Sequence, residues 1–145
     1  MSDYFIDTSA LVKHYRPEAG SVHVDAILSD AASQFQISSL TIVEFASTMQ
    51  RLKSRGEISP DELPLLLERF TADIGDTLLV LRFPRNWASI ARDLVLTHSI
   101  RTLDALQLAT ALQLKRSQLI FVAADSRLLA AAQANGLQIL NPLTA

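Results

Sequence analysis

Short runs of hydrophobic residues alternate along the chain with longer segments in which apolar side chains recur at helical spacing. The short runs have the composition of buried strands and lie at residues 4–6, 35–37, 77–81, 119–123 and 137–140. The longer segments predict helices from about residue 10, over 21–29, from 41 to about 55, and over 61–74, 86–98, 102–115 and 126–135. Strands separated by helices predict a single three-layer α/β domain over residues 1–145, with a mostly parallel sheet and helices on both faces.

Composition agrees with a globular domain and excludes several kinds of site. Of the 145 residues, 49% are hydrophobic and 19% are charged, which suits a protein with a sizeable core. The absence of cysteine excludes disulfide scaffolds and thiolate-bound metals, and the three histidines lack the spacing of a helical zinc motif. The four glycines form neither a GxGxxG motif nor a phosphate-binding loop.

Charge and the absence of targeting signals bear on partners and location. A net charge of -2 argues against an extensive nucleic-acid surface, but ten of the thirteen basic residues are arginine, which leaves a local phosphate-binding site open. The first residues do not form a signal peptide, and the longest uncharged stretch, residues 128–145, contains polar residues, glycine and proline. We therefore expect a soluble, cytoplasmic protein without a membrane anchor.

Two aspartates follow predicted strands. Asp7 comes directly after the first strand, and Asp125 comes shortly after the fourth, each just before a predicted helix. In an open parallel sheet, ligands bind beyond the carboxyl ends of the strands, so both side chains are placed for a functional site. Aspartate is also a favoured N-cap residue at such a turn, and the two roles are compatible.

A third aspartate, Asp104, lies in a predicted helix that is apolar on nearly every face. Such a helix is buried on most sides, and a carboxylate there needs a partner because burying an unpaired charge is unfavourable. This predicts a functional role for Asp104. The alternative is a first-turn aspartate that the helix dipole favours, with Thr102 as the N-cap.

Glu44 has a structural explanation of its own. It follows Thr41 by three residues, which is the spacing of a capping box, and it would lie on a solvated helix face. The core-facing side of the same helix would carry Ile42, Phe45, Ala46, Met49 and Leu52. Taken alone, Glu44 therefore points to no active site.

Considered together, the four acids predict a metal site. If the strands are parallel, all four come near one edge of the sheet. Two carboxylates about 4 Å apart repel each other by roughly 4 kcal/mol at an effective dielectric constant near 20, and a divalent cation removes this conflict. An all-oxygen ligand set favours Mg²⁺ or Mn²⁺. Such an ion beside a phosphodiester activates water for in-line attack and stabilises the leaving oxygen.

Four segments of the chain resemble the motifs of PIN-domain nucleases, in particular the small VapC-type toxins of bacterial and archaeal toxin–antitoxin pairs. The segments are YFIDTSAL at 4–11, ISSLTIVE at 37–44, RTLDALQLATA at 101–111 and FVAADSRL at 121–128. In the last segment, Ala124 stands where the family often has threonine. The resemblance covers nearly the whole chain, and the four motifs occur in the family's order.

The resemblance implies a PIN fold and an Mg²⁺- or Mn²⁺-dependent endoribonuclease. It further implies a toxin that forms a homodimer and that a small cognate antitoxin inhibits. By position, it assigns the catalytic and metal-binding roles to Asp7, Glu44, Asp104 and Asp125. The preference for RNA rests on the resemblance, because attack by an activated water does not use the 2′-hydroxyl group. A housekeeping RNA-processing nuclease and a non-catalytic PIN-like binding module remain alternatives.

Several residues beside the acids are candidates for binding substrate. By position, the resemblance makes Thr8, Ser9 and Ser126 candidates for orienting a ligand or a phosphate. Arg101 and Arg127 flank the third and fourth acids and can hold RNA phosphates beside an acidic centre. For either arginine alone, ordinary solvated surface with ion pairs is the favoured explanation.

Overall fold

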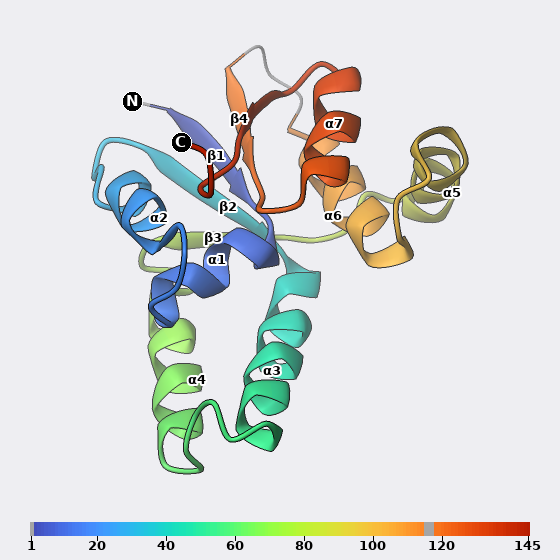
Figure 1. Ribbon diagram of the computed structural model, residues 1–145. Coiled ribbons are helices and arrows are strands. Elements are labelled where there is room, and N and C mark those ends of the chain that lie inside the picture. The colour runs from blue at the N-terminus through green and yellow to red at the C-terminus, as the bar shows by residue number, and fades with distance from the viewer. Residues whose placement is uncertain (1, 115–117) are drawn as a thin grey trace.

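The computed structural model describes residues 2–114 and 118–145 and contains a five-stranded, all-parallel sheet (Figure 1). In the sheet order β3-β2-β1-β4-β5, the strands are β3 (Leu78–Leu81), β2 (Gln34–Ser38), β1 (Asp3–Ile6), β4 (Leu119–Val122) and β5 (Gln138–Leu140). The helices are α1 (Thr8–Tyr15), α2 (Ser21–Leu28), α3 (Ser39–Ser54), α4 (Glu62–Asp73), α5 (Trp87–His98), α6 (Thr102–Leu112) and α7 (Ser126–Ala134). Within the described ranges, no helix combines the length and the apolar character that crossing a membrane requires.

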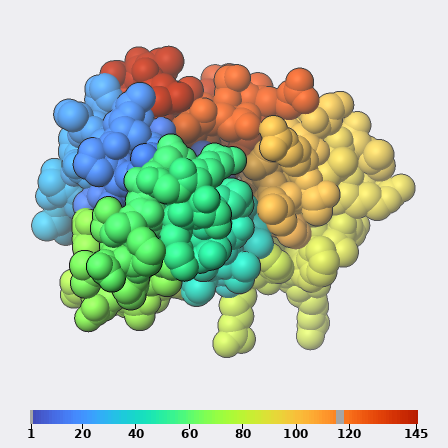
Figure 2. Space-filling view, turned by 60° about the horizontal axis from the view of Figure 1, so that its bottom comes forward, coloured from blue at the N-terminus to red at the C-terminus, as the bar shows by residue number. Residues whose placement is uncertain are grey.

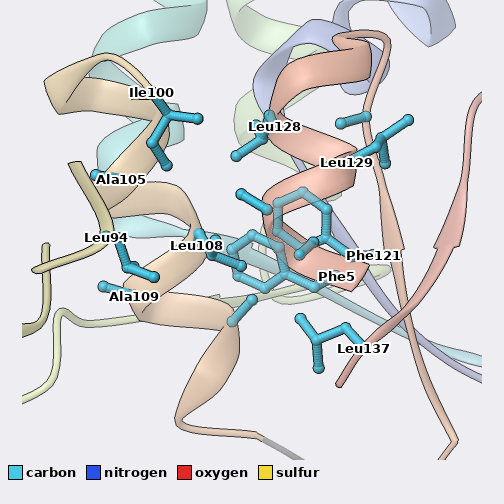
Figure 3. Packing of buried hydrophobic residues seen from close by; sticks show 14 of the residues in the cluster. Phe5, Leu94, Ile100, Ala105, Leu108, Ala109, Phe121, Leu128, Leu129 and Leu137 are labelled. Atoms are coloured by element: carbon cyan, nitrogen blue, oxygen red, sulfur yellow. The ribbon is translucent and has the colours of Figure 1, made fainter. Parts of the chain in front are cut away.

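The two faces of the sheet carry separate hydrophobic clusters, because side chains alternate along each strand. Phe5 and Phe121 face one way, whereas Ile6 and Val122 face the other. The rings of Phe5 and Phe121 stack with centroids 5.5 Å apart and lie in a cluster with α5, α6 and α7 (Figure 3). Ile6 and Val122 pack in a cluster with α1, α3 and α4. The predicted fold class, a parallel sheet with helices on both faces, is thereby confirmed.

The central strand, β1, lies where the chain changes direction across the sheet. From β1 the chain proceeds to β2 and β3 on one side, then returns through α5 and α6 to β4 and β5 on the other side. The carboxyl ends of β1 and β4 are therefore neighbours, and the backbone N–H of Asp7 donates to the carbonyl oxygen of Val122 at 2.9 Å. Ligands of open α/β sheets bind at this kind of topological switch point.

Several helix boundaries differ from the sequence-based expectation; α1, for example, begins at Thr8 rather than near residue 10. α3 begins at Ser39, earlier than predicted, because the Ser38 hydroxyl accepts a hydrogen bond from the Leu40 N–H at 3.1 Å and caps the helix. α6 ends at Leu112, and its predicted end, Lys115, lies outside the described residues.

The buried side of α3 also differs from the prediction. Thr41, Phe45 and Met49, which are four residues apart, form its buried stripe. Ile42 and Ala46 were expected in the core, but both are exposed, Ile42 by 43%. They lie about 100° around the helix from the buried stripe, on its solvent-exposed side. Glu44 therefore stands at the border of the buried stripe.

Candidate functional site

A cleft of about 750 Å³ opens where α1, α3 and α6 begin, beside the carboxyl end of β1. Three of the four predicted acids line it: Asp7, Glu44 and Asp104. α3, in teal to green, and α6, in orange, lie on the face that Figure 2 shows. The fold thus brings together three acids that are far apart in the sequence.

Asp7 is the most buried acid of the cleft, with 4% of its surface exposed. It is the N-cap of α1, and its Oδ2 accepts hydrogen bonds from Ser9 N at 3.1 Å and Ser9 Oγ at 2.5 Å. Burial raises the pKa of Asp7 to about 7, against the effect of the Ser9 hydrogen bonds; the charges of Glu44 and Asp104 raise it further. The Asp7 side chain therefore both caps α1 and lines the cleft.

Ser9 links Asp7 to the end of β4. While its hydroxyl donates to Asp7, its oxygen accepts a hydrogen bond from Ala124 N at 3.0 Å. This contact uses the backbone N–H of Ala124, so it does not depend on the side chain at that position. Ser9 lines the cleft beside Thr8.

Glu44 is held by side chains from two other helices. Its Oε1 accepts hydrogen bonds from Thr8 Oγ1 at 2.8 Å and from Gln107 Nε2 at 2.7 Å. The predicted capping box is wrong, because α3 begins at Ser39, so Thr41 already lies inside the helix. Glu44 is therefore fixed by tertiary contacts and faces the cleft.

Asp104 lies in the first turn of α6 and is half-buried. Burial raises its pKa, the charge of Asp125 raises it further, Arg101 opposes the shift, and Glu44 adds to it. Thr102 is not the N-cap of this helix: Arg101 holds that position, without a side-chain capping bond. Asp104 therefore shares the cleft with Asp7 and Glu44 and is affected by the charges of Glu44 and Asp125.

Asp125 stands beside the cleft rather than in its lining. It is the N-cap of α7, and its Oδ1 accepts a hydrogen bond from Leu128 N at 3.0 Å. Its charge nevertheless raises the pKa of Asp104. Ser126 and Arg127 are exposed at the start of α7 and do not line the cleft, and Arg127 Nη1 donates to the carbonyl oxygen of Ser99 at 3.4 Å.

Two residues at or next to the cleft were not expected as site residues from the sequence. Gln107 is fully buried and contacts Glu44; an amide in an otherwise apolar helical stretch was its only signal. Arg51, in the last turn of α3, lines the cleft. Its guanidinium donates to Ser47 Oγ at 2.8 Å and to Thr48 Oγ1 at 3.2 Å. No carboxylate pairs with Arg51 or with Arg101 among the described residues.

The donor chemistry of the cleft fits a hard divalent cation. Its potential ligands are carboxylate and hydroxyl oxygens, as Mg²⁺ and Mn²⁺ prefer. Burial is the main cause of the raised pKa values of Asp7 and Asp104, and the charges of neighbouring acids add to the rise; a bound cation would offset both effects. As they stand, no three histidine, aspartate or glutamate side chains of the described residues are close enough together to hold a metal ion. Binding therefore requires side-chain adjustment or water ligands.

Comparison with known proteins identifies the family. The family model described as PIN domain matches residues 4–134. The chain belongs to the PIN domain family. A search among curated proteins gives no match for this PIN domain.

Several solved structures share the fold of this PIN domain. FitAcB from Neisseria gonorrhoeae has a TM-score of 0.70 and 22% identity, and the alignment covers 98% of this chain and 99% of that chain. A toxin-antitoxin complex from Klebsiella pneumoniae has a TM-score of 0.66 and 17% identity, with 96% and 97% covered. VapBC2 from Rickettsia felis, bound to a DNA fragment from its promoter, has a TM-score of 0.65 and 14% identity, with 96% and 98% covered. At these identities the similarity establishes the fold.

Proposed function

We propose that this PIN domain is an Mg²⁺- or Mn²⁺-dependent endoribonuclease and the toxin of a toxin–antitoxin pair. The observation that carries the proposal is that Asp7, Glu44 and Asp104, from three separate motifs, line one cleft at the switch point of the sheet. Perturbed carboxylates gathered in a cleft are typical of functional sites. The assignment as a toxin is supported by the fold shared with chains of complexes named as toxin-antitoxin and VapBC assemblies.

In this proposal, Asp7, Glu44 and Asp104 hold the ion, with Asp125 completing the acidic set beside Asp104. A bound ion would supply an activated water and charge stabilisation of the leaving oxygen in phosphodiester hydrolysis. Ser9 keeps the Asp7 carboxylate oriented through two hydrogen bonds to one oxygen. Oriented carboxylates are what a small hard cation requires, because Mg²⁺ tolerates little departure from octahedral geometry.

Arg51 and Arg101 are the proposed phosphate contacts of the cleft. Both line it and neither pairs with a carboxylate among the described residues. A guanidinium group has five N–H donors, and the hydroxyls of Ser47 and Thr48 hold the Arg51 group while leaving further N–H groups for a ligand. These arginines would offset the repulsion between an RNA backbone and the acids. The Thr8 hydroxyl already donates its proton to Glu44. Ser126 and Arg127 lie outside the cleft and are more remote candidates for substrate contacts.

The nuclease proposal is tested by cleavage of labelled single-stranded RNA with Mn²⁺ and with EDTA. We expect Asp7→Asn and Asp104→Asn each to lower the rate by about 100-fold or more, because each removes a ligand charge from the site. Asp25→Asn is the matched control, since Asp25 is exposed and pairs with His14 outside this cleft. Wild-type rates in either cleft variant would remove that residue from the mechanism. A wild-type protein that binds Mn²⁺ without cutting RNA would be a binding module.

The toxin proposal implies a small antitoxin partner, a homodimer and action on cytoplasmic RNA. We expect expression of the chain to arrest growth, and expression of Asp7→Asn not to. Rescue by a co-expressed small protein encoded beside it would support the pair, whereas harmless expression of an active nuclease would favour a housekeeping role in RNA processing. Light scattering during size-exclusion chromatography measures whether the chain forms the proposed dimer.

A further inference from the structure

Gln107 lies fully buried in the middle of α6, where its neighbours Leu106 and Leu108 are core residues. Its amide nitrogen, Nε2, reaches three acceptors from two other helices. It lies 2.7 Å from Glu44 Oε1, 2.9 Å from Thr41 Oγ1 and 3.1 Å from Thr8 Oγ1. The amide group therefore joins α6 to α1 and α3 and contacts Glu44, which lines the cleft.

The available protons give this network a direction. Thr8 Oγ1 donates its single proton to Glu44 Oε1 at 2.8 Å, so Thr41 is the donor in the 2.9 Å contact between the two threonine hydroxyls. The amide has two N–H groups, and its two shortest contacts are to Glu44 and Thr41. The hydrogen bonds from Gln107 and from Thr8 therefore end on the same oxygen, Oε1 of Glu44. No hydrogen bond occupies its other oxygen, Oε2, among the described residues.

Stability alone does not explain an amide at this position. Gln107 Oε1 is buried and has no hydrogen-bond partner among the described residues. A buried carbonyl oxygen without a partner destabilises the folded state, and an apolar side chain of similar size would avoid that penalty. Core residues surround it in α6, so such a side chain would be compatible with the helix. The amide is therefore best explained by what its N–H groups hold.

We propose that Gln107 is a positioning residue that fixes Oε1 of Glu44 and thereby presents Oε2 as the metal-binding oxygen. This inference rests on the proposed function, in which Glu44 is a ligand of Mg²⁺ or Mn²⁺. A carboxylate held at one oxygen by two buried donors loses little further rotational freedom when a cation binds the other oxygen. Without Gln107, only Thr8 would hold Oε1 directly.

The experiment measures the Mn²⁺ dissociation constant by isothermal titration calorimetry, together with thermal unfolding in EDTA. Gln107→Met replaces the amide with an unbranched apolar side chain of similar length. We expect it to raise the dissociation constant by about 10- to 100-fold, the usual effect of removing a group that orients a ligand, and to leave the melting temperature in EDTA unchanged or higher. Thr110→Val is the matched control: Thr110 is buried in the same helix and bonds to Leu106 O at 2.8 Å, away from Glu44.

A double-mutant cycle with Glu44→Gln distinguishes the two proposals. If Gln107 acts through Glu44, Gln107→Met has no further effect on Mn²⁺ binding in the Glu44→Gln background. Wild-type affinity in Gln107→Met, with weaker binding in Glu44→Gln, would overturn the inference and leave the proposed metal site standing. A wild-type protein that binds no Mn²⁺ would overturn both.

A second variant covers the case in which Gln107→Met does not fold. Gln107→Asn keeps the amide but shortens the side chain by one methylene group, so it no longer reaches Glu44, and we expect the same loss of Mn²⁺ affinity. If both variants lose their fold in EDTA while Thr110→Val keeps it, Gln107 serves the core and the inference is wrong.

Discussion

The buried carboxylate of Asp7 opposes folding in the absence of metal, and the size of this effect follows from its pKa. Burial raises that pKa from the ordinary value of 3.8 to about 7. One pKa unit corresponds to about 1.4 kcal/mol, so keeping Asp7 ionised above pH 7 destabilises the folded state by up to about 4 kcal/mol. Asp7→Asn removes the charge but keeps an oxygen that can accept the Ser9 hydrogen bonds. We expect the metal-free variant to be more stable than the wild type at pH 8.

The pH dependence of this difference has a definite sign. Between about pH 4 and pH 7, the folded wild-type protein holds the Asp7 proton more tightly than the unfolded chain does. The contribution of Asp7 to the free energy of unfolding therefore falls as the pH rises through this window. Above pH 7 this contribution reaches its most unfavourable value and no longer changes with pH. The amide that Asp7→Asn introduces does not titrate. The stability advantage of the variant should be near zero below about pH 4, grow up to pH 7 and then level off.

Urea denaturation in EDTA from about pH 4 to pH 8.5 measures this difference. Saturating Mn²⁺ should reverse the order at pH 8, because it stabilises the wild type and not the variant. Asp93→Asn is the control, since Asp93 is exposed and pairs with the neighbouring Arg92, so its effect should be small and nearly independent of pH. A variant that is less stable than the wild type at pH 8 in EDTA would refute the assignment of Asp7 as a destabilising buried charge.

Three further substitutions test the surroundings of the acids. Ser9→Ala removes a hydrogen bond that favours ionised Asp7, so it should raise the pKa of Asp7 further and weaken Mn²⁺ binding most below pH 7, measured by calorimetry at several pH values. Arg51→Gln should weaken RNA binding and reduce the slope of log affinity against log salt by about 0.7, and an unchanged slope would exclude a phosphate contact. Asp125→Asn keeps an N-cap for α7, so the free energy of unfolding should change little while Mn²⁺ affinity falls. Wild-type affinity would leave Asp125 as a cap alone.

The pattern of hydrophobic residues along the chain was enough to predict most of the fold. The strand runs around Phe5, Phe35 and Phe121 are short and aromatic or branched, and helical periodicity separates them, so the parallel α/β arrangement could be predicted before any contact was known. Boundaries were less accurate where a side chain decides them. α3 begins at Ser39 because Ser38 caps it, whereas the spacing of Thr41 and Glu44 had suggested a later start.

The position of the site could be predicted in part. Asp7 and Asp104 were recognisable because one follows a strand and the other interrupts an apolar helix, and both line the cleft. Glu44 looked like a capping residue, since sequence spacing reports only neighbours along one helix. Its actual partners, Thr8 and Gln107, belong to two other helices.

The sequence by itself determined which elements form, which ends of strands carry acids and which ligand chemistry is possible. The tertiary structure decided where side chains lie: Arg51 lines the cleft, Gln107 is buried against Glu44, Asp125 lies beside the cleft, and Ile42 is exposed. The physical reason is the sequence separation over which each kind of interaction acts. Periodicity and capping act over a few residues, whereas the burial of Asp7 and the hydrogen bonds of Glu44 depend on segments that only the packing of helices on the sheet brings together.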